Sequence, residues 1–295
     1  MKKIILDTDI GDDIDDAFAL ALLLGSPEVQ LEGVTTVFRN TLKRAQLAKK
    51  LINAAGAEVP VYAGERIPIK EPFHLFAKDG ACAPEESSPC QWAEEYEAPV
   101  KAGAVDFLIE KAKELKGELT VLAIGPLTNL GRAIERDRAA MQGIGKIVLM
   151  GGSFSNHQPE WNILCDPEAA QTVIASGIPV YAVGLDVTLK CPLSEGLLDD
   201  FTQSGKEVNK LLSLWLKRWF DFFNFEKSVM HDPLAAATLL KEDICAFKQV
   251  YVKTDEAVRG ALLVSDVPKE GYSPVYTADR VNRDEFYALI RERML

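Results

Sequence analysis

Short apolar runs with the length of buried strands alternate along this chain with longer stretches of helical periodicity. The first run is IIL before Asp7, and the helical stretch after it, residues 14–24, ends at Gly25 and Pro27. The same order repeats as far as the strand-like PVYAVGLDV. Strand, helix and strand at this spacing are typical of parallel βαβ units. The sequence therefore predicts an α/β fold, with an open, mostly parallel, Rossmann-like sheet flanked by helices.

The pattern changes after Leu193. Helices follow, including the aromatic-rich SLWLKRWFDFFNF, and then strands near FKQVYVK and YSPVYTA. Residues 65–97 hold several prolines and two cysteines without clear periodicity, which indicates a lid-like loop or an insertion. No Ser/Gly-rich linker or repeat divides the 295 residues. We expect one domain, residues 1–295, with a helical C-terminal elaboration.

Charge and composition exclude several classes of partner. With 33 basic and 44 acidic residues the net charge is −11, which disfavours a nucleic-acid partner. No apolar run has the length of a membrane span, and the apolar stretch after Lys2 and Lys3 is interrupted at Asp7. Five widely spaced cysteines without a C-x-x-C pair predict reduced thiols. We expect a cytoplasmic protein with no membrane partner.

Ligands of open parallel sheets bind beyond the carboxyl ends of the strands, so the residues after each predicted strand are candidates for a site. Their polar groups are mainly carboxylates, amides and histidine, and no lysine, serine or cysteine among them is placed as a nucleophile. In chain order these stretches are DTDIGDDIDD, Asn40, GPLTN, GGSFSNHQPEWN, Asp186 and MHDP.

The segment ILDTDIGDDIDDAFAL places six aspartates around one turn. Each ionised carboxylate makes the next harder to ionise, and a hard divalent cation such as calcium, which prefers oxygen ligands, removes that cost. Asp9 and Asp16 could converge from either side of the glycine, whose backbone can fold tightly. Helix capping is the alternative. It can explain Asp12 or Asp13 but not Asp7 and Asp9, so the pattern favours a metal site.

Two other features have an ordinary explanation. The dipeptide of His231 and Asp232 indicates, by itself, a partly buried histidine more readily than a catalyst. The aromatic residues between Trp215 and Phe225 have the helical spacing of core residues, although one or two of them could wall a base-binding pocket.

Taken together, these segments resemble the nucleoside hydrolase family, the inosine-uridine-preferring type of ribohydrolase. They occur in the family's order from Ile5 to about Ala237. They are ILDTDIGDDIDDAFAL, GVTTVFRN, LAIGPLTNL, IVLMGG, EWNILCDPEAA, VGLDVT and MHDPLAAA. The resemblance implies calcium-dependent hydrolysis of the N-glycosidic bond of a ribonucleoside to free base and ribose. It also implies direct attack by a metal-bound water, hence inversion, and a homodimer or homotetramer.

The resemblance also implies roles for individual residues. Calcium would be bound by the carboxylates of Asp9, Asp16 and Asp232 and by the backbone carbonyl of Ile124. Asp9 would act as general base, and His231 would be the general acid for the leaving base. The residues expected to contact ribose are Asp15, Asn40, Asn156, Glu160 and Asn162, with Met150 lining the floor.

This assignment agrees with the chemistry of the bond. Cleavage passes through an oxocarbenium-like state, whose positive charge a pocket dense in carboxylates stabilises. The sugar carries no charge, so no phosphate-gripping arginine or lysine is expected.

Three departures from the family pattern leave alternatives open. Aligning on Asp15-Asp16-Ala17 makes the preceding Asp-Asp pair an insertion, and in the other register Asp13 is the metal ligand. The loop between MGG and EWN is short, which affects the match of Asn156. The stretch PFHLFAKDGACA departs from the family's pattern, so the role of His74 and the base preference stay open.

Two competing functions remain. Asp7-Thr8-Asp9 resembles the nucleophile and acid pair of haloacid-dehalogenase-like phosphatases, but Gly11 occupies a position where that family has Thr or Val, and the required lysine is not evident. A catalytically silent, calcium-dependent nucleoside-binding protein is the second competitor. The presence of both Asp9 and His231 argues against it.

Overall fold

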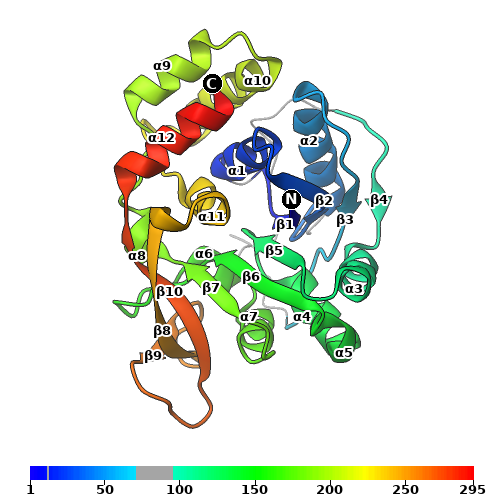
Figure 1. Ribbon diagram of the computed structural model, residues 1–295, viewed down its shortest axis with the longest axis vertical. Helices are drawn as coiled ribbons and strands as arrows, with labels where there is room; N and C mark the ends of the chain where they lie inside the picture. Colours follow the sequence, from blue (N-terminus) through cyan, green and yellow to red (C-terminus); the bar gives the residue numbers. More distant parts are fainter. Residues whose placement is uncertain (12, 71–95) are drawn as a thin grey trace, which may run out of the picture.

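The computed structural model describes residues 1–11, 13–70 and 96–295 and builds them around one ten-stranded sheet (Figure 1). The strand order is β4-β3-β2-β1-β5-β6-β7-β10-β8-β9. The strands are β1 (Lys2–Thr8), β2 (Val29–Thr36), β3 (Val61–Ala63), β4 (Lys101–Ala102), β5 (Leu119–Ala123), β6 (Ile144–Met150), β7 (Val180–Val183), β8 (Cys245–Thr254), β9 (Leu262–Ser265) and β10 (Ser273–Val281).

The sheet is parallel from β4 to β10 in spatial order, and only β8 and β9 run antiparallel to their neighbours. This confirms the predicted α/β fold with a mostly parallel sheet. The expected strands near FKQVYVK and YSPVYTA are β8 and β10, and they extend the same sheet. The C-terminal elaboration is therefore partly helical and partly a continuation of the sheet.

Helices cover both faces of the sheet (Figure 1). They are α1 (Asp15–Leu24), α2 (Thr41–Ala54), α3 (Ala104–Leu115), α4 (Thr128–Arg136), α5 (Arg138–Met141), α6 (Trp161–Cys165), α7 (Pro167–Ile174), α8 (Leu185–Thr188), α9 (Glu195–Gln203), α10 (Glu207–Phe223), α11 (His231–Leu240) and α12 (Arg283–Met294). None of the described helices is long and apolar enough to cross a bilayer.

Strand alternation divides the core between the two faces. Ile4 and Leu6 of β1 point to the face covered by α1, α2, α10, α11 and α12, whereas Ile5 points to the face covered by α3, α4, α5 and α7. All three side chains are fully buried. Helix α1 is buried on almost every side, because it packs against α2, α11 and α12 as well as the sheet. The start of α1 is thereby fixed at the carboxyl end of β1.

Two sequence expectations fall outside the description. Asp12 and residues 71–95, which include His74, lie outside the described residues. Most of the expected lid-like loop or insertion at 65–97 therefore also lies outside the described residues.

Candidate active site

A cavity of about 640 Å³ opens at the carboxyl ends of the central strands. Residues from the ends of β1, β2, β5, β6 and β7 contribute to its wall, as expected for an open parallel sheet. The lining residues are Asp9, Asp13, Asp15, Asp16, Arg39, Ile124, Met150, Pro159, Glu160, Trp161, Asn162, Leu185, Trp219, Phe223, Phe225, His231 and Asp232.

Three carboxylates converge in this cavity from two helices that are distant in the chain. Asp15 and Asp16 begin α1, and Asp232 is the second residue of α11. Each offers an oxygen within 4.8 Å of the others, and all three side chains are buried. The backbone N–H of Asp232 donates to Asp15 Oδ2 at 3.0 Å, and the hydroxyl of Thr8 donates to Asp16 Oδ1. The first bond joins the starts of α11 and α1, and the second joins the start of α1 to the end of β1.

Burial is the main reason why the pKa values of Asp15, Asp16 and Asp232 lie well above the ordinary value for aspartate. The negative charges of their neighbours, including Asp9, raise these pKa values further. A bound cation opposes both effects, because it replaces lost hydration and neutralises repulsion. Three buried, converging carboxylate oxygens therefore fit a hard divalent cation, and no soft ligand belongs to this cluster.

Asp9 lies beside this cluster, directly after β1, and is only 4% exposed. Its close approach to β5 depends on Gly125, because a Cβ there would lie 2.8 Å from Asp9 N and 2.9 Å from Asp9 Oδ1. The fully buried Arg44 of α2 also stabilises the turn after β1. Its Nη1 donates to the carbonyl of Asp9, and its Nε donates to the carbonyl of Phe38 at 2.7 Å.

The positions of the N-terminal aspartates only partly distinguish metal ligands from ribose ligands. The resemblance implied that Asp9 binds the metal and Asp15 binds ribose, whereas Asp15 belongs to the convergent cluster and Asp9 lies next to it. Asp13, the ligand in the alternative register, lines the cavity, and its Oδ1 accepts the N–H of Ile14 at 2.6 Å. The cluster of described residues includes Asp16 in its place. The individual assignments stay predictions.

The short helix α6 carries the polar groups on another wall. Glu160 caps it, with its carboxylate accepting the N–H groups of Asn162 at 2.9 Å, Ile163 at 3.1 Å and Gly152 at 3.0 Å. Burial raises the pKa of Glu160, and these bonds oppose that effect. Asn162 Nδ2 donates to the carbonyls of Ile124 at 2.9 Å and Met150 at 3.1 Å. The four residues predicted here from β5, β6 and α6 are thus brought together.

His231 and aromatic rings form the remaining wall. His231 begins α11, and its Nδ1 lies 2.7 Å from the hydroxyl of the buried Thr188. Burial lowers the pKa of His231 to about 4. Trp219, Phe223 and Phe225 come from the end of α10 and the residues after it, and the two Phe rings stack with centroids 5.6 Å apart. Such rings offer planar apolar surface to a planar ligand.

Two predicted ribose ligands lie elsewhere. Asn40 caps α2, where its Oδ1 accepts the N–H of Lys43 at 3.2 Å. Asn156 is exposed, and its Oδ1 accepts from the hydroxyl of Ser153 at 2.9 Å. Neither belongs to the described cavity lining, so a contact between either residue and ribose stays a prediction.

Sequence reasoning missed two arginines. The expectation that no phosphate-gripping arginine or lysine is needed gave no reason to consider Arg39, which lines the cavity. It follows β2 in a left-handed conformation (φ 58°), and its guanidinium lies 5.0 Å from the centre of the Phe38 ring. Its place at a strand end, next to Asn40, was the available signal. Arg44 of α2 was not singled out from the sequence, and it is fully buried; its position three and four residues before the apolar Leu47 and Ala48 was the available signal.

Comparison with known proteins gives a consistent assignment. A profile of the family described as inosine-uridine preferring nucleoside hydrolase matches residues 4–288. Uridine nucleosidase 1 of Arabidopsis thaliana is 32% identical over 321 residues, covering 100% of this chain and 93% of that protein.

Solved structures agree over nearly the whole chain. A plant nucleoside hydrolase superimposes with a TM-score of 0.81 at 27% identity, and a purine-preferring ribonucleoside hydrolase from Gardnerella vaginalis with 0.80 at 27%. Each match covers 99% of this chain and 98% of the other. The phosphatase alternative is therefore wrong. This chain belongs to the inosine-uridine preferring nucleoside hydrolase family and is a hydrolase of N-glycosyl bonds.

Proposed function

We propose that this protein hydrolyses ribonucleosides to free base and ribose in a calcium-dependent reaction that inverts the anomeric carbon. The observation that carries the proposal is the convergence of the Asp15, Asp16 and Asp232 carboxylates within 4.8 Å, inside a cavity with an aromatic wall. The wall suits a planar base, and the polar floor suits a sugar.

The donor set supports calcium. Asp9, Asp16, Asp232 and the carbonyl of Ile124 would hold the ion, with Asp15 close enough to share it or to bind ribose. All of these donors are oxygens, the ligands that calcium takes six to eight of. When bound, the ion supplies positive charge that acidifies a water and orients the vicinal hydroxyls of ribose.

Asp9 is the proposed general base. As the oxygen of the attacking water forms its bond to the anomeric carbon, the carbon–nitrogen bond breaks and its electron pair leaves with the base. Asp9 takes the proton from the water. No carboxylate is assigned as a nucleophile, so a single displacement inverts the anomeric centre. The buried carboxylates stabilise the positive charge that develops on the sugar.

His231 is the proposed proton donor to the leaving base. The contact of 2.7 Å between its Nδ1 and the Thr188 hydroxyl fixes the ring, which leaves Nε2 for the base. The rings of Trp219, Phe223 and Phe225 would stack on the base, and Glu160 and Asn162 would bind ribose.

The test is a panel of ribosides and 2′-deoxyribosides, assayed with calcium and with a chelator. Uridine is tested first, because the Arabidopsis relative is named uridine nucleosidase, and inosine is tested second. We expect free base and ribose to accumulate only with calcium, 2′-deoxyribosides to react far more slowly, and NMR to detect the inverted anomer first.

Turnover of ribosides that persists unchanged after chelation would refute the calcium dependence. Binding of ribosides without release of base would instead identify the silent binding protein. A homodimer or homotetramer is also proposed, and light scattering measures it directly.

A further inference from the structure

The turn between β8 and β9, residues 255–261, lies against the segment that carries Glu160, Trp161 and Asn162. The hairpin is the antiparallel edge of the sheet (Figure 1, orange) and contributes no residue to the described cavity lining. The N–H of Glu160 nevertheless donates to the carbonyl of Gly260 at 3.1 Å. The edge hairpin therefore contacts the cavity wall from behind.

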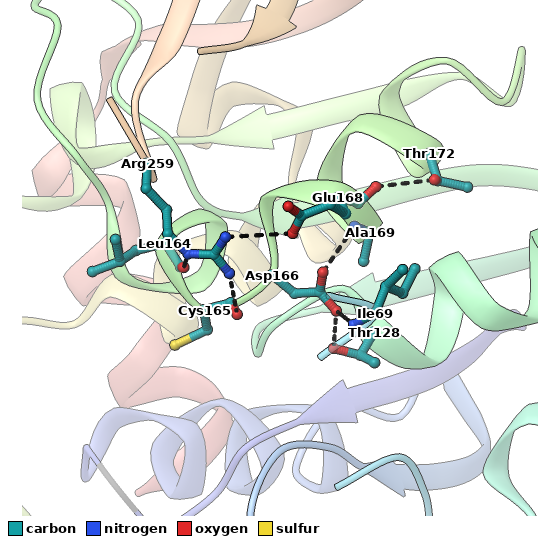
Figure 2. A network of polar contacts seen from close by, with 9 residues as sticks. All are labelled: Ile69, Thr128, Leu164, Cys165, Asp166, Glu168, Ala169, Thr172 and Arg259. Atoms are coloured by element: carbon teal, nitrogen blue, oxygen red, sulfur yellow. Dashed lines mark hydrogen bonds and ion pairs between the residues drawn. The ribbon is translucent and has the colours of Figure 1, made fainter. Parts of the chain in front are cut away.

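Arg259 of this turn caps the other end of α6. Its Nε donates to the carbonyl of Leu164 at 3.0 Å and its Nη2 donates to the carbonyl of Cys165 at 3.3 Å (Figure 2). Its Nη1 lies 3.5 Å from Glu168 Oε2. The last carbonyls of a helix have no partner within the helix, and a cation there interacts favourably with the helix dipole.

Helix α6 depends on such outside contacts because it is only five residues long. A helix of this length is not stable by itself in water. The turn contacts α6 at both ends, because the carbonyl of Gly260 accepts from its N-terminal end and the guanidinium of Arg259 donates to its C-terminal end. Gly260 has a positive φ of 87°, and a Cβ there would lie 2.8 Å from Leu164 Cβ, so the turn is also in close contact with the helix.

A further contact joins the turn to the residues before α6. His157 Nε2 lies 2.7 Å from Asp255 Oδ2, at the start of the same turn. On the opposite side, Asp166 fixes the junction between α6 and α7 to the start of α4 and to the segment after β3. It accepts from the hydroxyl of Thr128 at 2.7 Å and from the N–H of Ile69 at 2.9 Å (Figure 2).

We propose that Arg259 is a positioning residue for the ribose side of the cavity. By holding the end of α6, it aims the Asn162 side chain between the carbonyls of Ile124 and Met150 and keeps Glu160 beside it. The inference rests on the proposed function for the identity of the ligand. The convergent carboxylates come from α1 and α11, which Arg259 does not contact through any of these bonds, so the part of the proposed metal site that they form does not depend on it.

The experiment compares Arg259→Gln with Arg259→Lys, and with Arg291→Gln as a matched control at an exposed ion pair with Asp200. The KM and kcat for uridine and inosine are measured at saturating calcium. Calcium affinity is measured by calorimetry, and the Tm is recorded for each variant. Gly260→Ala is a second probe of the same contact, for the case that Arg259→Gln does not fold.

We expect Arg259→Gln to raise KM about tenfold for both nucleosides, with kcat and calcium affinity each within about threefold of wild type. A small effect on calcium is allowed because Asn162 donates to the carbonyl of Ile124, one of the proposed ligands. The lysine variant should recover part of the loss, because its ammonium can reach one of the two carbonyls. Gly260→Ala should raise KM in the same way, and Arg291→Gln should match wild type.

A KM within twofold of wild type would overturn the proposal. So would a parallel loss of kcat, calcium affinity and Tm, which indicates a role in folding alone. Wild-type turnover tests the proposed function separately. If wild type is inactive, calorimetry measures the nucleoside Kd of wild type and of Arg259→Gln instead. A higher Kd in the variant supports the positioning role, and equal Kd values overturn it.

Discussion

Replacing Asp16 by asparagine should stabilise the metal-free protein and weaken its response to calcium. The carboxylate oxygens of Asp15, Asp16 and Asp232 lie within 4.8 Å of one another in a buried site. Without a cation their repulsion opposes folding, and with a cation the same charges supply the attraction. Asp16→Asn should therefore raise the stability of the metal-free protein and lower the stability of the calcium-bound protein.

The expected size follows from the geometry. Two like charges 4.8 Å apart repel by about 3.5 kcal/mol at an effective dielectric constant of about 20. Asp16 takes part in two such pairs, but a carboxyl group that binds a proton avoids part of the cost. We expect Asp16→Asn to stabilise the metal-free protein by about 1–3 kcal/mol, or roughly 2–5 °C in Tm.

Thermal unfolding at pH 8, with a chelator and with excess calcium, measures both effects. Wild type should gain about 2.7 kcal/mol at a calcium concentration 100 times its Kd, and Asp16→Asn should gain much less because a ligand is lost. Asp106→Asn removes a 65%-exposed carboxylate that pairs with Arg136 and serves as the control. The reasoning is refuted if Asp16→Asn is less stable than wild type in chelator and gains as much from calcium.

Four further outcomes are expected. Asp9→Asn should lower kcat by orders of magnitude with little change in KM, and near-normal turnover in steady-state assays would remove Asp9 from the general-base role. His231→Ala should reduce turnover of inosine far more than turnover of a riboside with an activated phenolate leaving group, and equal losses would mean that His231 only positions the substrate. Arg44→Met should lower the free energy of unfolding by about 2–4 kcal/mol, because it leaves buried carbonyls without a donor, and an unchanged denaturation midpoint would contradict this. Burial raises the pKa of the thiols of Cys191 to about 11 and Cys245 to about 12, so peptide mapping should find neither alkylated at pH 8 in the folded protein and both alkylated after unfolding.

Local sequence patterns were sufficient to predict the arrangement of the sheet. IIL and the later apolar runs became buried strands because each is bounded by turn residues and followed by a helical stretch. The rule that ligands bind at the carboxyl ends of parallel strands then selected the stretch that holds Asp9, which lines the cavity. This prediction needed only contacts within and between adjacent βα units. Ile124 and Met150, which also line the cavity, were implied by the resemblance alone.

Contacts between distant segments could not be predicted in this way. The bond from the N–H of Asp232 to Asp15 joins residues 217 positions apart, and only the resemblance to a family suggested that they meet. Arg44 lies on the buried face of α2, with Leu47, Ala48 and Leu51, but the carbonyls that accept from its guanidinium come from the distant turn after β1. The support that Arg259 gives to α6 is of the same kind.

Six N-terminal aspartates are crowded in the sequence, but the five that the structure describes are less crowded in space. Asp7 lies within β1, where its Oδ1 accepts from the hydroxyl of Thr35 at 2.6 Å and from the Asn129 amide at 2.7 Å. Burial raises the pKa of Asp7 to about 7 despite these bonds, so its charge is partly removed at neutral pH.

The other described aspartates of this segment also divide their roles. Asp13 accepts a backbone N–H, and Asp9 faces the cavity beside the cluster. Asp15 and Asp16 remain as the convergent pair, and the third carboxylate, Asp232, comes from α11. A single doubly charged ion therefore has three converging carboxylates to offset, with Asp9 next to them. That number is within what calcium binds in proteins, so the crowded sequence and a compact metal site are compatible.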